Sequence, residues 1–172
     1  MGPASRNAQF KQIETTIGGS SLQQARWPPS NIAGSQNTAL SRLFALAGSK
    51  YVDPEFSWRY EVAPGGIGFL TSGNLGTQYE DDLFMGAATS QMEGGYIFRF
   101  NLTSDRLRIS VSADSRLSDR VADNTGKHNI TESETLLFGR NFGTSTDIQT
   151  GPNGNLFVVS LSQGAVYEIY RP

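Results

Sequence analysis

Short stretches in which apolar and polar residues alternate dominate the chain after Tyr51, and they predict β-strands. Apolar and aromatic side chains occupy every second position from Phe56 to Val62, a pattern typical of a strand with one buried face. Leu107 to Val111 alternates with arginine and serine and predicts a half-exposed strand. Pro64-Gly65 predicts a turn between two strands. Further strands are expected at residues 66–70, 83–87, 96–102, 136–138, 146–150, 156–161 and 165–170.

The chain also repeats itself. Residues 83–86 (LFMG) and 95–100 (GYIFRF) recur as residues 156–159 (LFVV) and 164–170 (GAVYEIY), and the first positions of the two copies are 73 residues apart. Each copy predicts a β-hairpin in which Phe84 is equivalent to Phe157 and Ile97 to Val166. A repeated unit of this length suits a four-stranded β-propeller blade with insertions.

Glycine and proline separate the predicted strands. The chain has 19 Gly and 7 Pro, which mark many tight turns and disfavour a helical fold. Its 172 residues are enough for a hydrophobic core but too few for a whole propeller with blades of this length. The expected fold is therefore all-β, with about two to three β-propeller blades over residues 51–172. Residues 1–50 carry few strand signals and predict a loop-rich N-terminal excursion.

The charge balance excludes several kinds of partner. There are 14 Lys+Arg and 16 Asp+Glu, a formal net charge of −2 with no basic block, so nucleic acid and anionic membranes are poor partners. No apolar run approaches the roughly 18 residues of a membrane-spanning helix. The chain contains no cysteine, which excludes disulfides, zinc–thiolate sites and cysteine nucleophiles.

The termini and surface signals bear on location and assembly. Residues 1–6 lack the layout of a signal peptide, so we expect a protein that stays inside the cell or a chain that begins within a longer one. Asn101 and Asn129 begin N-glycosylation sequons, which matter only if the source glycosylates. Because outer blades would leave unpaired strand edges, we expect a homo-oligomer or a chain whose N-terminal blades are missing.

An ordered series of segments resembles a known family. The segments are residues 51–58 (YVDPEFSW), the Val62-Ala63-Pro64 turn, residues 83–86 (LFMG) and residues 146–160 (TDIQTGPNGNLFVVS). Together they resemble the C-terminal part of the soluble quinoprotein glucose/sorbosone dehydrogenase-like family, over roughly Tyr51 to Tyr170. The resemblance implies a six-bladed β-propeller that oxidises a sugar or related alcohol with calcium-supported pyrroloquinoline quinone (PQQ). It also implies an extracytoplasmic location, periplasmic or secreted.

The resemblance also points to a cofactor site. Active members of the family place a lysine just after the Leu-Phe-x-Gly strand and two arginines before the Asp-x-x-x-Gly-Pro turn, where this chain has Thr89, Thr144 and Thr146. The nearest cation is Arg140, so the candidate cofactor-binding positions are Thr89, Arg140, Thr144 and Thr146. A tricarboxylated quinone requires fixed cations. The family's catalytic histidine belongs to an earlier blade that this chain does not contain, so we expect no quinone reaction by this chain alone and assign no catalytic residue.

Two other groups of residues are candidates for catalysis or metal binding. His128 is the only histidine and lies in a polar loop, either as a solvated surface group or as an acid–base residue. Glu80-Asp81-Asp82, Asp119 and Asp123 offer oxygen atoms to calcium but lack the spacing of a calcium loop, so no metal ligand is assigned. Two functions remain open: oxidation of a small sugar by a larger protein or assembly that contains this chain, or a non-catalytic binding module that keeps the propeller blades.

Overall fold

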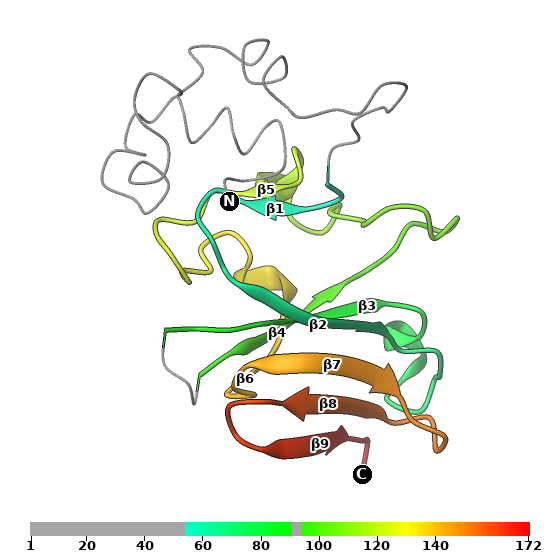
Figure 1. Cartoon of the computed structure of the whole chain (residues 1–172). Coiled ribbons are helices and arrows are strands. Elements are labelled where there is room, and N and C mark those ends of the chain that lie inside the picture. Colours follow the sequence, from blue (N-terminus) through cyan, green and yellow to red (C-terminus); the bar gives the residue numbers. More distant parts are fainter. Residues whose placement is uncertain (1–53, 91–93) are drawn as a thin grey trace, which may run out of the picture.

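The computed structural model describes residues 54–90 and 94–172, and these form short strands joined by turns (Figure 1). The strands are β1 (Ser57–Trp58), β2 (Pro64–Phe69), β3 (Leu83–Ala87), β4 (Tyr96–Phe100), β5 (Val121–Ala122), β6 (Leu137–Arg140), β7 (Ser145–Thr150), β8 (Leu156–Ser160) and β9 (Ala165–Ile169). Three 3₁₀ helices span Thr77–Tyr79, Ser115–Leu117 and Glu134–Leu136, and the described ranges contain no α-helix. The expected all-β fold is confirmed, and the expected excursion at residues 1–50 lies outside the described residues. In the same ranges, no helix is long and apolar enough to cross a membrane.

The strands form two antiparallel sheets and one short parallel pair. The first sheet has the order β2-β3-β4-β6 and the second has the order β7-β8-β9. β1 and β5 pair in parallel, with Ser57 beside Val121 and Trp58 beside Ala122. Figure 1 shows β7 next to β2, so the second sheet lies beside the first, with the β1–β5 pair on the other side. The strands of the second sheet follow one another in sequence, the commonest arrangement, whereas in the first sheet β5 intervenes between β4 and β6 and pairs with β1 instead.

The two predicted hairpins are present and share one register. In β3–β4, Gly86 lies opposite Ile97, and in β8–β9, Val159 lies opposite Val166. Neither hairpin contains a register shift. Ile97 and Val166 are therefore equivalent positions, as the sequence repeat predicts.

Equivalent side chains of the two hairpins have different surroundings. Phe84 and Ile97 are fully buried, because the face of the first sheet that carries them packs against Leu156 of the second sheet and its neighbours. The same face of the second sheet carries Phe157, which is half-buried, and Val166, which is 64% exposed. The two sheets thus have equivalent faces. The second sheet covers that face of the first sheet, whereas no described residues form a sheet over that face of the second.

Two hydrophobic clusters stabilise the fold. The cluster between the two sheets contains Leu70, Leu75, Phe84, Ile97, Ile148, Leu156 and Val158. The cluster on the other face of the first sheet contains Trp58, Val62, Ala87, Phe98, Phe100, Ile109, Leu117 and Ala122. The Trp58 indole is fixed there by its Nε1, which donates a hydrogen bond to Ser133 Oγ at 2.9 Å. Burial of such side chains is the main favourable term in folding.

Glycine lets the two sheets approach closely at their adjoining strands. A Cβ atom at Gly68 of β2 would lie 1.8 Å from the carbonyl oxygen of Ile148 in β7. A side chain at this position would therefore push the sheets apart.

The half-exposed strand predicted for Leu107 to Val111 is wrong. Leu107 is 76% exposed, and only Ile109 forms an isolated bridge, with Leu102. The cause is a tight turn that precedes it: the Arg106 amide donates to the Thr103 carbonyl at 2.7 Å, and Arg106 has a φ of 57°. Local turn bonding therefore overrides the alternating pattern.

The strand and turn predicted between Pro54 and Gly65 also need correction. Only Ser57–Trp58 forms a strand there, although Trp58 and Val62 are buried as the alternation predicts. Pro64-Gly65 is not a turn but the beginning of β2, where the register against β3 shifts after Pro64. Such an irregularity accommodates proline, which has no amide hydrogen to donate to the ladder.

Candidate functional site

A pocket of about 310 Å³ lies at one end of the first sheet, where the β3–β4 connection, the beginning of β4 and the end of β6 meet a loop from elsewhere in the chain. Its lining residues are Thr89, Ser90, Gly94, Gly95, Tyr96, His128, Arg140 and Asn141. We call it the Arg140 pocket. Strand pairing builds it, because Tyr96 of β4 lies directly opposite Arg140 of β6.

Arg140 is the permanent cation of this pocket. Its guanidinium lies over the Tyr96 ring, 5.5 Å from the ring centroid, which is cation–π range. The salt bridges found among the described residues do not include Arg140. An exposed guanidinium that forms no salt bridge with a carboxylate of residues 54–90 or 94–172 is suited to an oxyanion such as a carboxylate or a phosphate.

His128 lines the same pocket from a loop more than 30 residues away from the β3–β4 connection. Its backbone has a φ of 60°, and its amide donates to the Glu61 carbonyl at 2.8 Å, which fixes the loop against the chain before β2. The ring is half-buried, and its Nδ1 has no hydrogen-bond partner among the described residues. A buried polar atom in that state is costly, because it has lost water without gaining a bond.

The structure brings together two of the four positions derived from the family resemblance. Thr89 and Arg140 line one pocket, whereas Thr144 and Thr146 are not among its lining residues. Thr144 is held by the C-terminal hairpin, since its amide donates to Ser162 Oγ at 2.8 Å and its carbonyl accepts from the Leu161 amide at 2.8 Å. Thr146 is exposed on β7.

These residues do not fit the cofactor that the resemblance implies. A tricarboxylated quinone needs several fixed cations, and the lining of the Arg140 pocket supplies one permanent cation and one histidine. Across residues 54–90 and 94–172, no group of three or more His, Cys, Asp or Glu residues is placed to hold a metal ion. No step of quinone or calcium chemistry is therefore derived for this chain.

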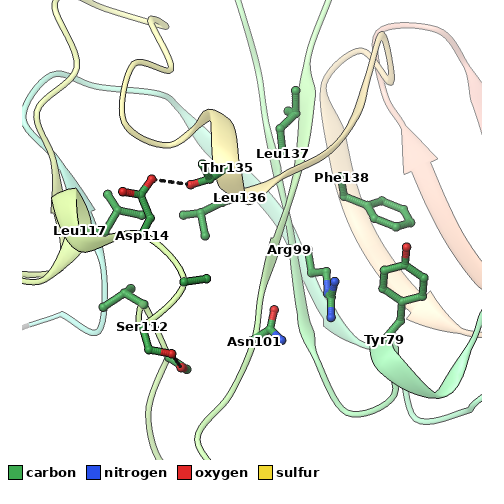
Figure 2. A pocket seen from close by; sticks show the side chains of 13 residues that line it. Tyr79, Arg99, Asn101, Ser112, Asp114, Leu117, Thr135, Leu136, Leu137 and Phe138 are labelled. Atoms are coloured by element: carbon green, nitrogen blue, oxygen red, sulfur yellow. Dashed lines mark hydrogen bonds between the residues drawn. The ribbon is translucent and has the colours of Figure 1, made fainter.

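A second pocket, of about 350 Å³, opens where β4 extends past the beginning of β6 (Figure 2). We call it the Arg99 pocket. Arg99 Nε donates to Asp82 Oδ2 at 2.5 Å, and the Arg99 guanidinium lies 4.5 Å from the Tyr79 ring centroid. Burial raises the pKa of Asp82, while Arg99 acts in the opposite direction. The Arg99 charge is thus already neutralised, which makes this pocket a weaker anion site than the Arg140 pocket.

Sequence reasoning did not find the Arg99 pocket or the participation of His128. Tyr79, Arg99, Asn101 and Asp114 come from three separate segments, and Figure 2 shows them around one opening. No local spacing relates these segments, because tertiary packing alone assembles them. For the Arg140 pocket, the family resemblance indicated Thr89 and Arg140, but no signal in the sequence placed His128 beside them.

No protein-family model, no curated protein and no solved structure matches this chain.

Proposed function

We propose that this chain is a non-catalytic binding module whose ligand is a small molecule with a carboxylate or phosphate group, held in the Arg140 pocket. The observation that carries the proposal is Arg140 itself, an exposed guanidinium on a pocket wall with no salt-bridge partner among the described residues. Arginine presents a planar fork of donors that matches the two oxygens of a carboxylate or phosphate.

The other lining residues support the same ligand class. Ser90 is exposed and can donate a hydroxyl hydrogen bond, and Tyr96 holds the guanidinium from the opposite strand. A pocket of about 310 Å³ lies at the small end of the range for small-molecule sites. The ligand we propose is accordingly compact, of the size of a sugar acid or a sugar phosphate.

The proposed scaffold is a pair of β-propeller blades. Two features support it: the hairpins of the two sheets share one register, and the sheets pack face to face with β2 beside β7. Radial repetition of such sheets is the construction of a propeller.

Oxidation of a sugar by a quinone-containing assembly is the second candidate function. The observation that favours it is that Thr89 and Arg140, which the family resemblance relates to the cofactor site, share one pocket. In that case the missing cations would have to come from another part of a larger protein or assembly.

Calorimetric titration of the chain with gluconate, citrate and inorganic phosphate tests the first candidate. We expect at least one probe to bind, and Arg140→Ala to weaken it roughly tenfold to a hundredfold, because a hydrogen bond to a charged group contributes about 1.5–3 kcal/mol. Arg108→Ala, an exposed arginine outside the pocket lining, is the matched control and should bind as the wild type does. Equal affinities of the two variants would contradict the proposal.

A titration with PQQ and calcium separates the two candidates. The binding module should bind the quinone weakly, because three contacts to cations are missing at Thr89, Thr144 and Thr146. Submicromolar binding would favour the oxidoreductase. Restoring lysine at Thr89 and arginine at Thr144 and Thr146 should raise the affinity if these positions correspond to the family's cofactor site, and no gain would show that they do not.

A further inference from the structure

The second sheet is one strand shorter than the first. In the first sheet, β4 pairs with β3 on one side and with β6 on the other, where Ile97 lies opposite Gly139. β9 is the strand equivalent to β4, and among the described residues it pairs only with β8. The position equivalent to β6 is therefore open along the outer edge of β9, at the bottom of the view in Figure 1.

β9 has only one of the features that usually protect an open edge, a single charged residue. Strand edges are normally blocked by charged side chains, lysine above all, by proline, by a bulge or by a covering segment. β9 (AVYEI) contains no lysine or proline and follows β8 without a register shift. Its one charged residue, Glu168, is bound from its own sheet, since the side-chain amides of Asn153 and Asn155 each donate to Glu168 Oε1 at 2.7 Å.

Exposed apolar side chains surround this edge. Val166 is 64% exposed; Leu161, in the β8–β9 turn, and Tyr170, directly after β9, are 70% and 62% exposed. Ile97, the equivalent of Val166 in the first sheet, is buried by the second sheet, so Val166 lies on an uncovered sheet face as well as on an open edge strand. An open backbone edge beside exposed apolar side chains is typical of a strand that accepts another strand.

A third sheet stacked in the manner of the second does not fit this surface. β7 approaches β2 closely because Gly68, opposite Phe84, has no side chain. The equivalent position of the second sheet is Gln149, opposite Phe157. The glutamine side chain prevents the same close approach, so an added partner pairs with the edge of β9 more readily than it stacks on β7.

We propose that two copies of this chain associate by antiparallel pairing of their β9 strands, which joins the two C-terminal sheets into one. A strand that pairs with its own copy about a two-fold axis needs only one type of edge, and this interface closes after two copies. The formal net charge of −2 per chain opposes association only weakly. Residues 1–50 carry few strand signals and are a poorer source of the missing strand.

Mass measurement by light scattering across a range of concentrations tests the association. The wild type should change from monomer to dimer as concentration rises, and Val166→Lys should raise the dissociation constant at least about tenfold, since it places a charge in the interface of both copies. Ile67→Lys is the matched control, because Ile67 is also a β-branched residue in a strand and is 57% exposed, but lies on β2. A wild type that stays monomeric, or two variants that dissociate equally, would overturn the proposal.

Hydrogen exchange of the β9 amides in the full chain shows which segment, if any, pairs with the open edge of β9. In a β9–β9 dimer, the outward amides of residues 165–169 are protected at high concentration and exchange rapidly at low concentration. Protection that does not depend on concentration, in a monomer, would overturn the proposal and assign the edge to a segment of the same chain. Dimerisation with unprotected β9 amides would also overturn it, because the interface would then lie elsewhere. These results do not depend on whether the Arg140 pocket binds an oxyanion.

Discussion

At the scale of single residues, Gly68 decides how closely the two sheets pack. Gly68→Ala should destabilise the protein by about 3 kcal/mol, because the new Cβ would lie 1.8 Å from a backbone carbonyl oxygen that cannot move without its strand. Gly126→Ala is the control: nothing lies within 4 Å of a Cβ at that position, so its effect should stay within about 0.5 kcal/mol. Urea unfolding of the two variants measures both values. Similar losses in both would show that the β2–β7 contact is not tight in solution.

Asp114 makes stability depend on pH. The Arg116 side chain is the largest cause of a strongly lowered pKa of Asp114, and Thr135 Oγ1 also donates to the carboxylate at 2.9 Å. Because the folded-state pKa lies below the unfolded value of about 3.9, the stabilisation is complete above that value and is lost as pH falls toward the folded pKa.

Asp114→Asn should therefore lower the urea midpoint at pH 7, and the difference from the wild type should shrink steadily below about pH 4. Urea unfolding at a series of pH values checks this. A difference that is independent of pH would mean that the Asp114 charge does not stabilise the fold.

At the scale of the elements, the repeat predicts unequal costs for the same substitution. Phe84 and Phe157 occupy equivalent strand positions, but Phe84 is fully buried between the sheets and Phe157 is half-buried on the uncovered face. Phe84→Ala should cost about 3–5 kcal/mol and Phe157→Ala clearly less, because less apolar area is lost. Denaturant unfolding at a protein concentration that keeps both variants monomeric makes the comparison. Equal costs would show that the second face is also covered in the monomer.

The hairpins could be predicted from the sequence because each is encoded locally. Period-two alternation defines their strands, and a turn such as the β8–β9 turn at Gly164, which has a φ of 59°, is encoded by glycine. The strand predicted at Leu107 to Val111 failed for the opposite reason. Its alternation is real, but its pairing with the chain around Leu102 is limited to one isolated bridge, and the turn at Arg106 takes the chain out of the extended conformation.

The candidate site could be predicted only in part. Thr89 and Arg140 were indicated by the family resemblance, and both line the Arg140 pocket, in the β3–β4 connection and at the end of β6. His128 could not be placed, since its position depends on the hydrogen bond from its amide to Glu61, a contact between segments distant in sequence.

At the scale of the whole molecule, the two sheets and the β1–β5 pair depend on one another across the sequence. The surface between the sheets uses residues of β2, β3 and β4 together with β7 and β8. The cluster on the other face of the first sheet is completed by β1 and by the segment that contains Leu117 and Ala122. The first sheet is therefore covered on both faces, while the second is covered on one among the described residues.

The hydrogen bond from Trp58 to Ser133 joins residues 75 positions apart. A ribosome adds about 5–20 residues per second, so several seconds pass between the synthesis of these two residues. During that time the Trp58 side chain lacks its hydrogen-bond partner. Closing so long a loop is also slow, because the chain loses conformational entropy before the stabilising contact forms. The aromatic cluster around Trp58 is thus incomplete on the nascent chain until Ser133 has been synthesised.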